Sequence, residues 1–172
     1  MFRKATLDDL ESINSIYNDI HTEEEEGRAS INWRRGVYPT KETACDAVLE
    51  GDLFVELDGD IIVASARINQ KQVAEYKDAD WKYFAPDNEV MVLHTLAVSP
   101  KLKNKGYGTR FVEFYEKYAL ECGCRYLRMD TWENNLTARA LYKKLGYSEV
   151  GIVTSEFNGI GGFRLVCLEK KL

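Results

Sequence analysis

The sequence predicts a mixed α/β fold with one central sheet of about seven strands and helices on both faces. Two observations carry this prediction. Strand-like runs and helical apolar stripes follow one another in the order β-α-α-β-β-β-α-β-α-β-β, which is neither strictly alternating nor all-β. Residues 90–98, VMVLHTLAV, are too apolar for a strand with one face in water, so they predict a strand at the centre of the sheet. Without a repeat or low-complexity linker, residues 1–172 are expected to form a single domain.

The first quarter of the chain predicts one strand and two helices. Residues 2–5 read as a short strand, after which Thr6 can cap a helix. The apolar face of that helix recurs at helical spacing, as Leu10, Ile13, Ile16, Tyr17 and Ile20. A polar stretch, residues 21–39, follows. Thr40 can then cap a second helix that ends near Gly51.

A hairpin and a long connection come next. Residues 53–57 and 61–68 are apolar, and the Asp58-Gly59-Asp60 turn between them supplies a glycine for positive φ. Residues 70–88 are polar and aromatic and predict a long loop or a frayed helix. Pro100 ends the central strand that follows them.

The last third of the chain predicts two helices and three strands. The glycine-rich residues 105–108 open a helix, and residues 125–131 form a strand. Asn134 or Asn135 caps the next helix, which Gly146 stops. The two final strands cover residues 147–154 and 163–168, on either side of a glycine-rich turn at 158–162.

Composition excludes several classes of function. The formal net charge is 23 − 28 = −5 and the pI is about 5.2, so a broad basic footprint for nucleic acid is not expected. Four cysteines, Cys45, Cys122, Cys124 and Cys167, lack the paired C-x-x-C spacing of a zinc site, and no metal is predicted. No secretory leader and no apolar run long enough for a membrane helix is apparent, which favours a cytoplasmic protein.

Residues 101–110 are a candidate anion site. A strand, a basic turn, two glycines and a helix follow one another here, which exposes backbone N–H groups at a helix N-terminus. The cations are Lys101, Lys103, Lys105 and Arg110. The segment fits neither a Walker loop nor a dinucleotide fingerprint. An ordinary glycine turn with solvated lysines remains the alternative.

Two motifs in this part of the chain resemble a known family, the GCN5-related N-acetyltransferases (GNAT). Residues 96–108, LAVSPKLKNKGYG, are similar to its acetyl-CoA-binding motif, in which Arg or Gln is followed by two residues, Gly, one residue, and Gly or Ala; Lys103 stands at the first position. Residues 135–147, NLTARALYKKLGY, are similar to its N-x-x-A-x-x-L-Y-x-x-x-G-F pattern. Both motifs stand in the family's order.

The resemblance implies a sheet splayed between its fourth and fifth strands, and direct transfer of an acetyl group from acetyl-CoA to an amine. The pantetheine arm is expected to pair with the strand at residues 90–98, with backbone N–H groups receiving the pyrophosphate and the acetyl carbonyl. The cofactor-binding residues that the resemblance implies are Leu96, Ala97, Val98, Lys103, Asn104, Lys105, Gly106, Tyr107, Gly108, Thr109 and Asn135.

Two catalytic roles also follow from the resemblance. Tyr142 occupies the position of the general acid that protonates the leaving thiolate, although an aromatic residue at this spacing can equally be core. His94 is the candidate general base, and strand alternation would put it on the same face as Leu96. A satisfied core histidine is the alternative, with Glu89 or a water chain then acting as the base.

The acceptor side is predicted less closely. In the family it is lined by segments that correspond to residues 21–39 and 155–162. The acidic run Glu23–Glu26 with Trp33 could attract a cationic amine such as a polyamine, or could be a solvated loop. A second aromatic group could wall the pocket or form a homodimer interface: Tyr76, Trp81, Tyr83 and Phe84.

Three functions therefore remain open from the sequence. The first is an N-acetyltransferase that acts on a small-molecule amine. The second is the same enzyme with a protein N-terminus or lysine as acceptor. The third is an acyl-CoA-binding module without catalysis.

Overall fold

The computed structural model describes residues 1–157 and 160–172. The chain forms two compact units, one made of residues 1–68 and 94–114 and the other of residues 69–93 and 115–172. Its strands form a seven-stranded sheet in the order β1-β2-β3-β4-β5-β7-β6 within the described residues. Strands β4 and β5 pair in parallel, whereas the pairs β1·β2, β2·β3, β5·β7 and β6·β7 are antiparallel. The predicted fold class, with β4 inside the sheet, is confirmed.

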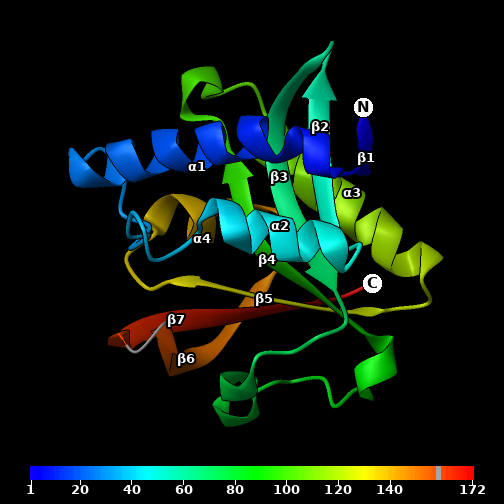
Figure 1. Ribbon diagram of the computed structural model, residues 1–172. Helices are drawn as coiled ribbons and strands as arrows, with labels where there is room; N and C mark the ends of the chain where they lie inside the picture. The colour runs from blue at the N-terminus through cyan, green and yellow to red at the C-terminus, as the bar shows by residue number, and fades with distance from the viewer. Residues whose placement is uncertain (158–159) are drawn as a thin grey trace. The chain divides into compact units, whose positions relative to one another are not determined.

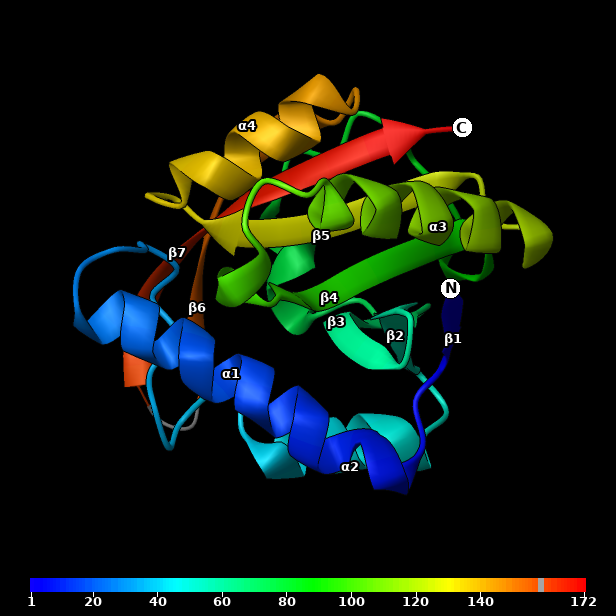
Figure 2. The same ribbon diagram turned by 90° about the horizontal axis from the view of Figure 1, so that it is seen from above.

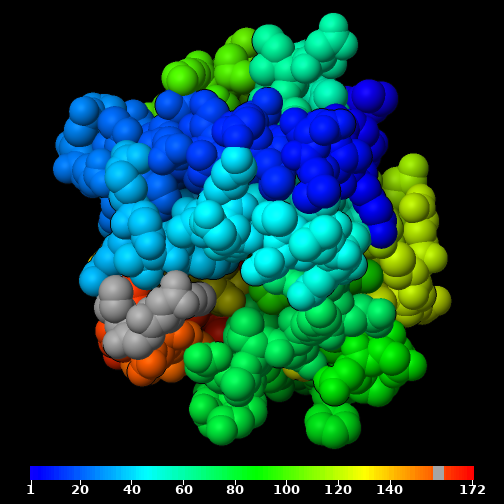
Figure 3. Space-filling view, in the orientation of Figure 1, coloured from blue at the N-terminus to red at the C-terminus, as the bar shows by residue number. Residues whose placement is uncertain are grey.

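In the first unit, helices α1 (Leu10–Glu25) and α2 (Lys41–Leu49) pack against each other (Figures 1 and 3). Thr40 caps α2 as predicted, because its Oγ1 accepts a hydrogen bond from the backbone of Thr43. A 3-10 turn, η1 (Leu7–Asp9), precedes α1. The helix then runs past the predicted start of the polar stretch at residue 21, since polarity alone does not end a helix.

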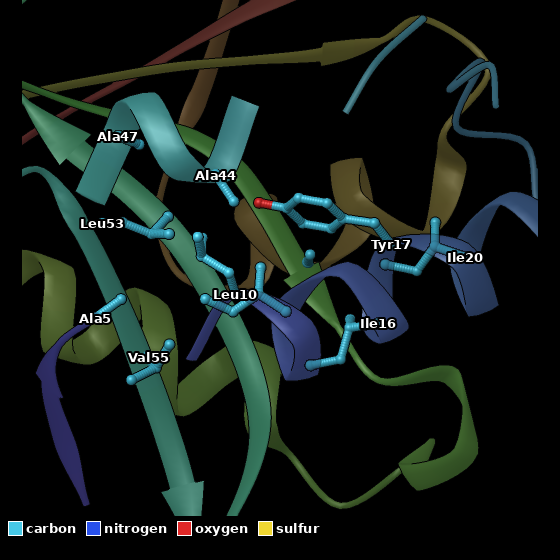
Figure 4. Close-up of a cluster of buried hydrophobic side chains, with 11 residues drawn as sticks. Ala5, Leu10, Ile16, Tyr17, Ile20, Ala44, Ala47, Leu53 and Val55 are labelled. Atoms are coloured by element: carbon cyan, nitrogen blue, oxygen red, sulfur yellow. The ribbon is translucent and has the colours of Figure 1, made fainter. Parts of the chain in front are cut away.

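Strand β2 (Leu53–Asp58) carries helices on both of its faces. Leu53 and Val55 point into the core beneath α1 and α2, where Figure 4 shows the Tyr17 ring reaching from α1 towards Ala44 of α2. The alternate residue Phe54 packs against Phe114 of α3 (Tyr107–Glu121), with ring centroids 5.6 Å apart. Strand alternation thus separates two apolar layers. Figure 2 shows the edge of this arrangement, with β1 (Phe2–Lys4) beside β2.

The hairpin and the N-terminal strand follow the predicted pattern. Strand β3 (Ile61–Asn69) returns from the predicted Asp58-Gly59-Asp60 turn, in which Gly59 has a φ of +60°. A bulge between Glu56 and Leu57 shifts the β2·β3 register.

The second unit is built on β5 (Tyr126–Trp132), β6 (Ser148–Phe157) and β7 (Ile160–Lys171), with α4 (Leu136–Lys144). Strands β6 and β7 extend further than predicted, because their ladder continues to the Phe157–Ile160 pair; residues 158–159 of the predicted turn lie outside the described residues. The predicted loop at 70–88 contains two 3-10 turns, η2 (Ala74–Asp78) and η3 (Asp87–Glu89). No helix in the described part of the chain has the length and apolarity needed to cross a membrane.

Candidate active site

Strand β4 (Val90–Val98) is interrupted in its second half. Its parallel ladder with β5 runs from Val90 to Leu93, paired with Tyr126 to Met129. Thr95 has a φ of +53°, which β-branched residues rarely adopt, and its Oγ1 is hydrogen-bonded to the Tyr38 hydroxyl. The family resemblance predicts the departure from regular pairing near residues 96–98, and the irregular backbone begins slightly earlier, at Thr95.

This irregularity bears on His94. The expectation that His94 and Leu96 share one face assumes a regular strand, and Thr95 breaks that alternation. His94, Thr95 and Leu96 are all half-buried in succession, whereas Ala97 is fully buried. The strand therefore presents three consecutive side chains that keep some contact with solvent.

The turn after β4 leaves a group of backbone donors without acceptors. After η4 (Pro100–Leu102), Asn104 and Gly106 have φ values of +64° and +77°. Helix α3 then begins at Tyr107, and the first N–H to find an intrahelical carbonyl is that of Arg110, which donates to the Gly106 oxygen at 3.0 Å. Among the described residues, the backbone N–H groups of residues 104–109 have no backbone acceptor. Free backbone N–H groups in a turn at a helix N-terminus can bind an anion.

Gly106 keeps this cradle open. A Cβ built at Gly106 would have no described atom within 4 Å, so the space over the turn is clear, and the positive φ favours glycine. A diphosphate needs both features: donors that converge and a backbone that can be approached closely. The turn therefore has free backbone donors and open space above Gly106, which are the features of an anion site.

Three of the four cations of this segment have acidic partners in the structure. Lys101 pairs with Asp19 of α1 at 2.8 Å, and Lys103 pairs with Glu23 of the same helix. Arg110 pairs with buried Glu56 at 2.7 Å. In the part of the chain that the structure describes, no acidic side chain pairs with Lys105.

Tyr107 and Arg110 instead anchor the start of α3. The Tyr107 hydroxyl donates to Asp58 at 2.5 Å, and the Arg110 guanidinium lies 4.3 Å from the centre of the Tyr107 ring. The sequence analysis placed Tyr107 and Arg110 in the anion site, whereas their side chains contact Asp58 and Glu56 of strand β2.

The acidic run Glu23–Glu26 is not an open cation site, which corrects the proposed attraction of a cationic acceptor. Residues 23–25 belong to the last turn of α1, and each of the four carboxylates has a partner. Glu23 pairs with Arg28 and Lys103, and Glu24 accepts from the backbone N–H groups of Ile31 and Asn32. Glu25 pairs with Arg35, and Glu26 pairs with Arg28. Arg28 and Lys103 together lower the pKa of Glu23 to about 2.

Asn135 of the second motif caps helix α4. Its Oδ1 accepts from the Ala138 N–H at 3.2 Å, and its Nδ2 donates to Thr131 Oγ1 at 3.1 Å. Of the two predicted cap residues, Asn135 is therefore the one used.

Tyr142 lies on α4 with its ring buried, 6 % exposed. Burial, and then the negative charge of Asp130, raise the pKa of Tyr142, so the hydroxyl stays protonated at neutral pH. None of the described residues offers this hydroxyl a hydrogen-bond partner. It is thus a phenol that holds its proton and has a free O–H to donate.

Asp130 of β5 is a functional candidate that sequence reasoning missed, and its partner is Tyr76 of η2, which the sequence offered only as part of an aromatic group. The Tyr76 hydroxyl donates to Asp130 Oδ2 at 2.7 Å, and burial raises the pKa of Asp130 to about 6. An aspartate among the strand residues YLRMDTW, close after the buried positions Leu127 and Met129, was the available signal.

Most of the second aromatic group packs within its own unit. Tyr76 and Trp81 form an edge contact at 5.1 Å, and the Trp81 indole N–H donates to the Tyr76 carbonyl. Tyr83 lies 6.0 Å from Tyr126, whereas Phe84 is fully exposed. The homodimer interface stays a prediction, and the exposed Phe84 ring is its candidate contact.

Comparison with known proteins identifies the family of this chain. The acetyltransferase (GNAT) family pattern matches residues 10–147. A stretch of 60 residues is 35% identical to the uncharacterized N-acetyltransferase YhfO of Bacillus subtilis (strain 168), covering 35% of this chain and 40% of that relative.

Two solved structures have the same fold over almost their whole length. A GNAT-family acetyltransferase from Streptococcus agalactiae 2603 superimposes with a TM-score of 0.83 at 20% identity, covering 100% of this chain and 95% of that one. The yncA structure from Salmonella typhimurium, with its cofactor acetyl-CoA, gives a TM-score of 0.68 at 16% identity, covering 100% and 93%. With the family pattern matched across most of the chain, the protein belongs to the acetyltransferase (GNAT) family.

Proposed function

We propose that this protein transfers an acetyl group from acetyl-CoA to a primary amine by direct attack within a ternary complex. The observation that carries the proposal is the cradle of backbone N–H groups at residues 104–109, open above Gly106. It includes Lys105, with which no described acidic side chain pairs. Bound acetyl-CoA would supply an activated thioester. The cradle would hold its pyrophosphate, and the backbone of residues 96–98 would offer the acetyl carbonyl an N–H donor.

Tyr142 is proposed as the general acid. Its raised pKa keeps the proton available, and a free O–H can hydrogen-bond sulfur as negative charge develops on it. Asn135 is assigned the cap of α4 together with contact to the cofactor. For the proton that the acceptor ammonium must lose, the sequence offers His94, Glu89 or a water chain.

A small cationic amine is the proposed acceptor, in a cytoplasmic enzyme. The support is the half-buried carboxylate of Asp130, since a cation entering the second unit would meet it close to Tyr142.

The test is a thiol-release assay with acetyl-CoA and a panel of acceptors. The panel holds spermidine, lysine methyl ester, kanamycin and an unblocked peptide. We expect turnover with at least one small amine, and preference for the peptide would instead assign a protein acceptor. Acetyl-CoA binding without turnover on any amine would contradict the enzyme and favour the non-catalytic binding module.

A further inference from the structure

Asp130 occupies a distinctive position in strand β5. On one side of β5 the ladder to β4 ends at Met129, the residue before Asp130; on the other side Asp130 pairs with Cys167 of β7. Leu127 and Met129 are buried, and strand alternation turns Asp130 to the face opposite theirs, which it shares with Arg128. Asp130 is half-buried, whereas these three neighbours are buried.

The segment of residues 70–85 covers that face. The Arg128 guanidinium donates to Gln72 and to the Tyr83 carbonyl, and stacks 4.1 Å from the Trp81 ring. The Arg128 guanidinium therefore binds the segment of residues 70–85. It forms no ion pair with Asp130 in the described part of the chain.

Only one neutral donor is recorded on the Asp130 carboxylate. Tyr76 donates to Oδ2 at 2.7 Å, and no described residue is recorded as donating to Oδ1. Asp130 as a whole is half-buried, so its side chain is not closed off from solvent. A carboxylate without a cation, with one oxygen held and the other open, is complementary to an ammonium group.

The titratable groups facing Asp130 come from three other elements. Glu75 and Tyr76 lie on η2, Cys167 on β7 and Tyr142 on α4. Burial raises the pKa of Asp130, the Tyr76 hydrogen bond lowers it and the charge of Glu75 raises it, with the result at about 6. Asp130 in turn raises the pKa values of Tyr142 and Cys167, for each of which burial is the larger cause.

We propose that Asp130 receives the ammonium group of the acceptor and takes its proton before the nitrogen attacks. This assignment rests on the proposed acetyl transfer, and it adds a residue that the family motifs in this chain do not contain. Tyr76 is the positioning residue that holds the carboxylate through Oδ2.

The proton balance is complete without another reactant. One N–H bond of the ammonium breaks, and its proton moves to the Asp130 carboxylate. The freed electron pair forms the C–N bond to the acyl carbon, and the C–S bond breaks with its electron pair on sulfur. The sulfur takes a proton through the Tyr142 hydroxyl, which regains one from the acylated nitrogen, and Asp130 returns its proton to water.

The test compares Asp130→Asn with the wild type, on the panel amine with the highest turnover. Asparagine keeps the shape and can still accept from Tyr76, but it cannot hold a proton. We expect kcat/KM for the amine to fall about 100-fold. The wild-type acid limb near pH 6 should be absent in the variant, and acetyl-CoA affinity should not change. Asp78→Asn, an exposed aspartate on the same 3-10 turn as Tyr76, is the matched control and should behave as wild type.

Tyr76→Phe gives a second measurement that a structural role would not move. Loss of the O–H donor destabilises the ionised carboxylate of Asp130, so the acid limb of the pH–rate profile should move to higher pH. This shift tests the role of Asp130 even if the Asp130→Asn variant does not fold. An unchanged rate in Asp130→Asn, or an unchanged limb in Tyr76→Phe, would overturn the assignment and leave the proposed acetyl transfer intact. A wild type that binds acetyl-CoA but acetylates no amine would overturn both.

Discussion

Gly106 has both a positive φ and open space above it, and two matched substitutions can separate the effects of these features. Its φ of +77° strains any residue with a Cβ, and its open side faces the space where an anion would bind. Gly106→Glu should abolish acetyl-CoA binding, because it adds a carboxylate to the cradle, and should lower stability by about 1 kcal/mol. Gly123→Glu is the matched control, with a φ of +79° and the same open surroundings. It should show the same loss in urea unfolding and normal binding in calorimetry; equal binding by both variants would contradict the cradle.

Tyr142 is where the chemistry can be separated from cofactor binding. Phenylalanine retains the buried ring and removes the hydroxyl that would protonate the thiolate. Tyr142→Phe should lower kcat by about 100-fold at unchanged acetyl-CoA affinity, measured by thiol release and by calorimetry. If kcat stays at the wild-type value, the family role assigned to Tyr142 does not hold in this chain.

Residue-scale prediction succeeded where the cause is local. Thr40 and Asn135 cap helices because their side chains reach backbone N–H groups three residues away, so sequence alone identifies Thr40 and narrows the second cap to Asn134 or Asn135. The acidic partners of Lys101 and Lys103 could not be predicted, because Asp19 and Glu23 are some 80 residues away in the chain. Asp130 was missed because its hydrogen-bond partner, Tyr76, lies 54 positions away in the sequence.

At the scale of elements, the last turns of α1 are tied to the turn that precedes α3. The Glu23–Lys103 and Asp19–Lys101 pairs form this link. Glu23 therefore competes with any phosphate for Lys103. The motif position that the family gives to Arg or Gln is held here by a lysine with an acidic partner.

This link predicts a gain of affinity on substitution. Glu23→Gln frees Lys103 and should tighten acetyl-CoA binding about two- to fivefold at low salt, the range of an exposed ion pair. Glu25→Gln is the matched control, because Glu25 lies on the same turn but pairs with Arg35. Calorimetry at two salt concentrations checks the result, and equal affinity in both variants would show that Lys103 does not contact the cofactor.

Element boundaries and types were largely predictable, and the exceptions share a physical reason. Strands β6 and β7 were drawn too short because the ladder between them, and not residue type, carries the pairing to Phe157. Thr95 is a strand former by propensity, so its left-handed backbone cannot be read from the sequence. The family resemblance did anticipate an irregularity in this strand, since it carried information on the fold that propensity lacks.

For the whole molecule, the net charge of −5 does not show how the fold pairs basic and acidic side chains. Sequence suggested one basic segment at residues 101–110 and one acidic run at residues 23–26. The fold joins them through Lys103 and Glu23, so most of that contrast is neutralised within the first unit. Fewer groups are then left to bind a ligand. They are the backbone donors with Lys105 in the first unit, and Asp130 in the second.

The stability of the whole chain should depend on pH through the buried Glu56. Burial raises the pKa of Glu56, and Arg110, which pairs with Oε1 at 2.7 Å, opposes that rise. An acid with a raised pKa in the folded state favours folding when protonated, and this contribution is lost as pH rises above its unfolded value. Removing Arg110 raises the pKa further, so the loss should be larger at neutral pH than in acid.

Arg110→Met should therefore lower the free energy of unfolding by about 2 kcal/mol at pH 7. This is less than for a fully buried pair, because the Arg110 side chain is 46% exposed. At pH 4 the difference should shrink, since Glu56 then takes up a proton in the variant. Urea unfolding at the two pH values measures it, and the double variant Glu56→Gln with Arg110→Met should recover most of the loss at pH 7. A deficit that is equal at both pH values, and that the double variant keeps, would mean that lost packing of Arg110 on Tyr107 causes the instability, and not the charge of Glu56.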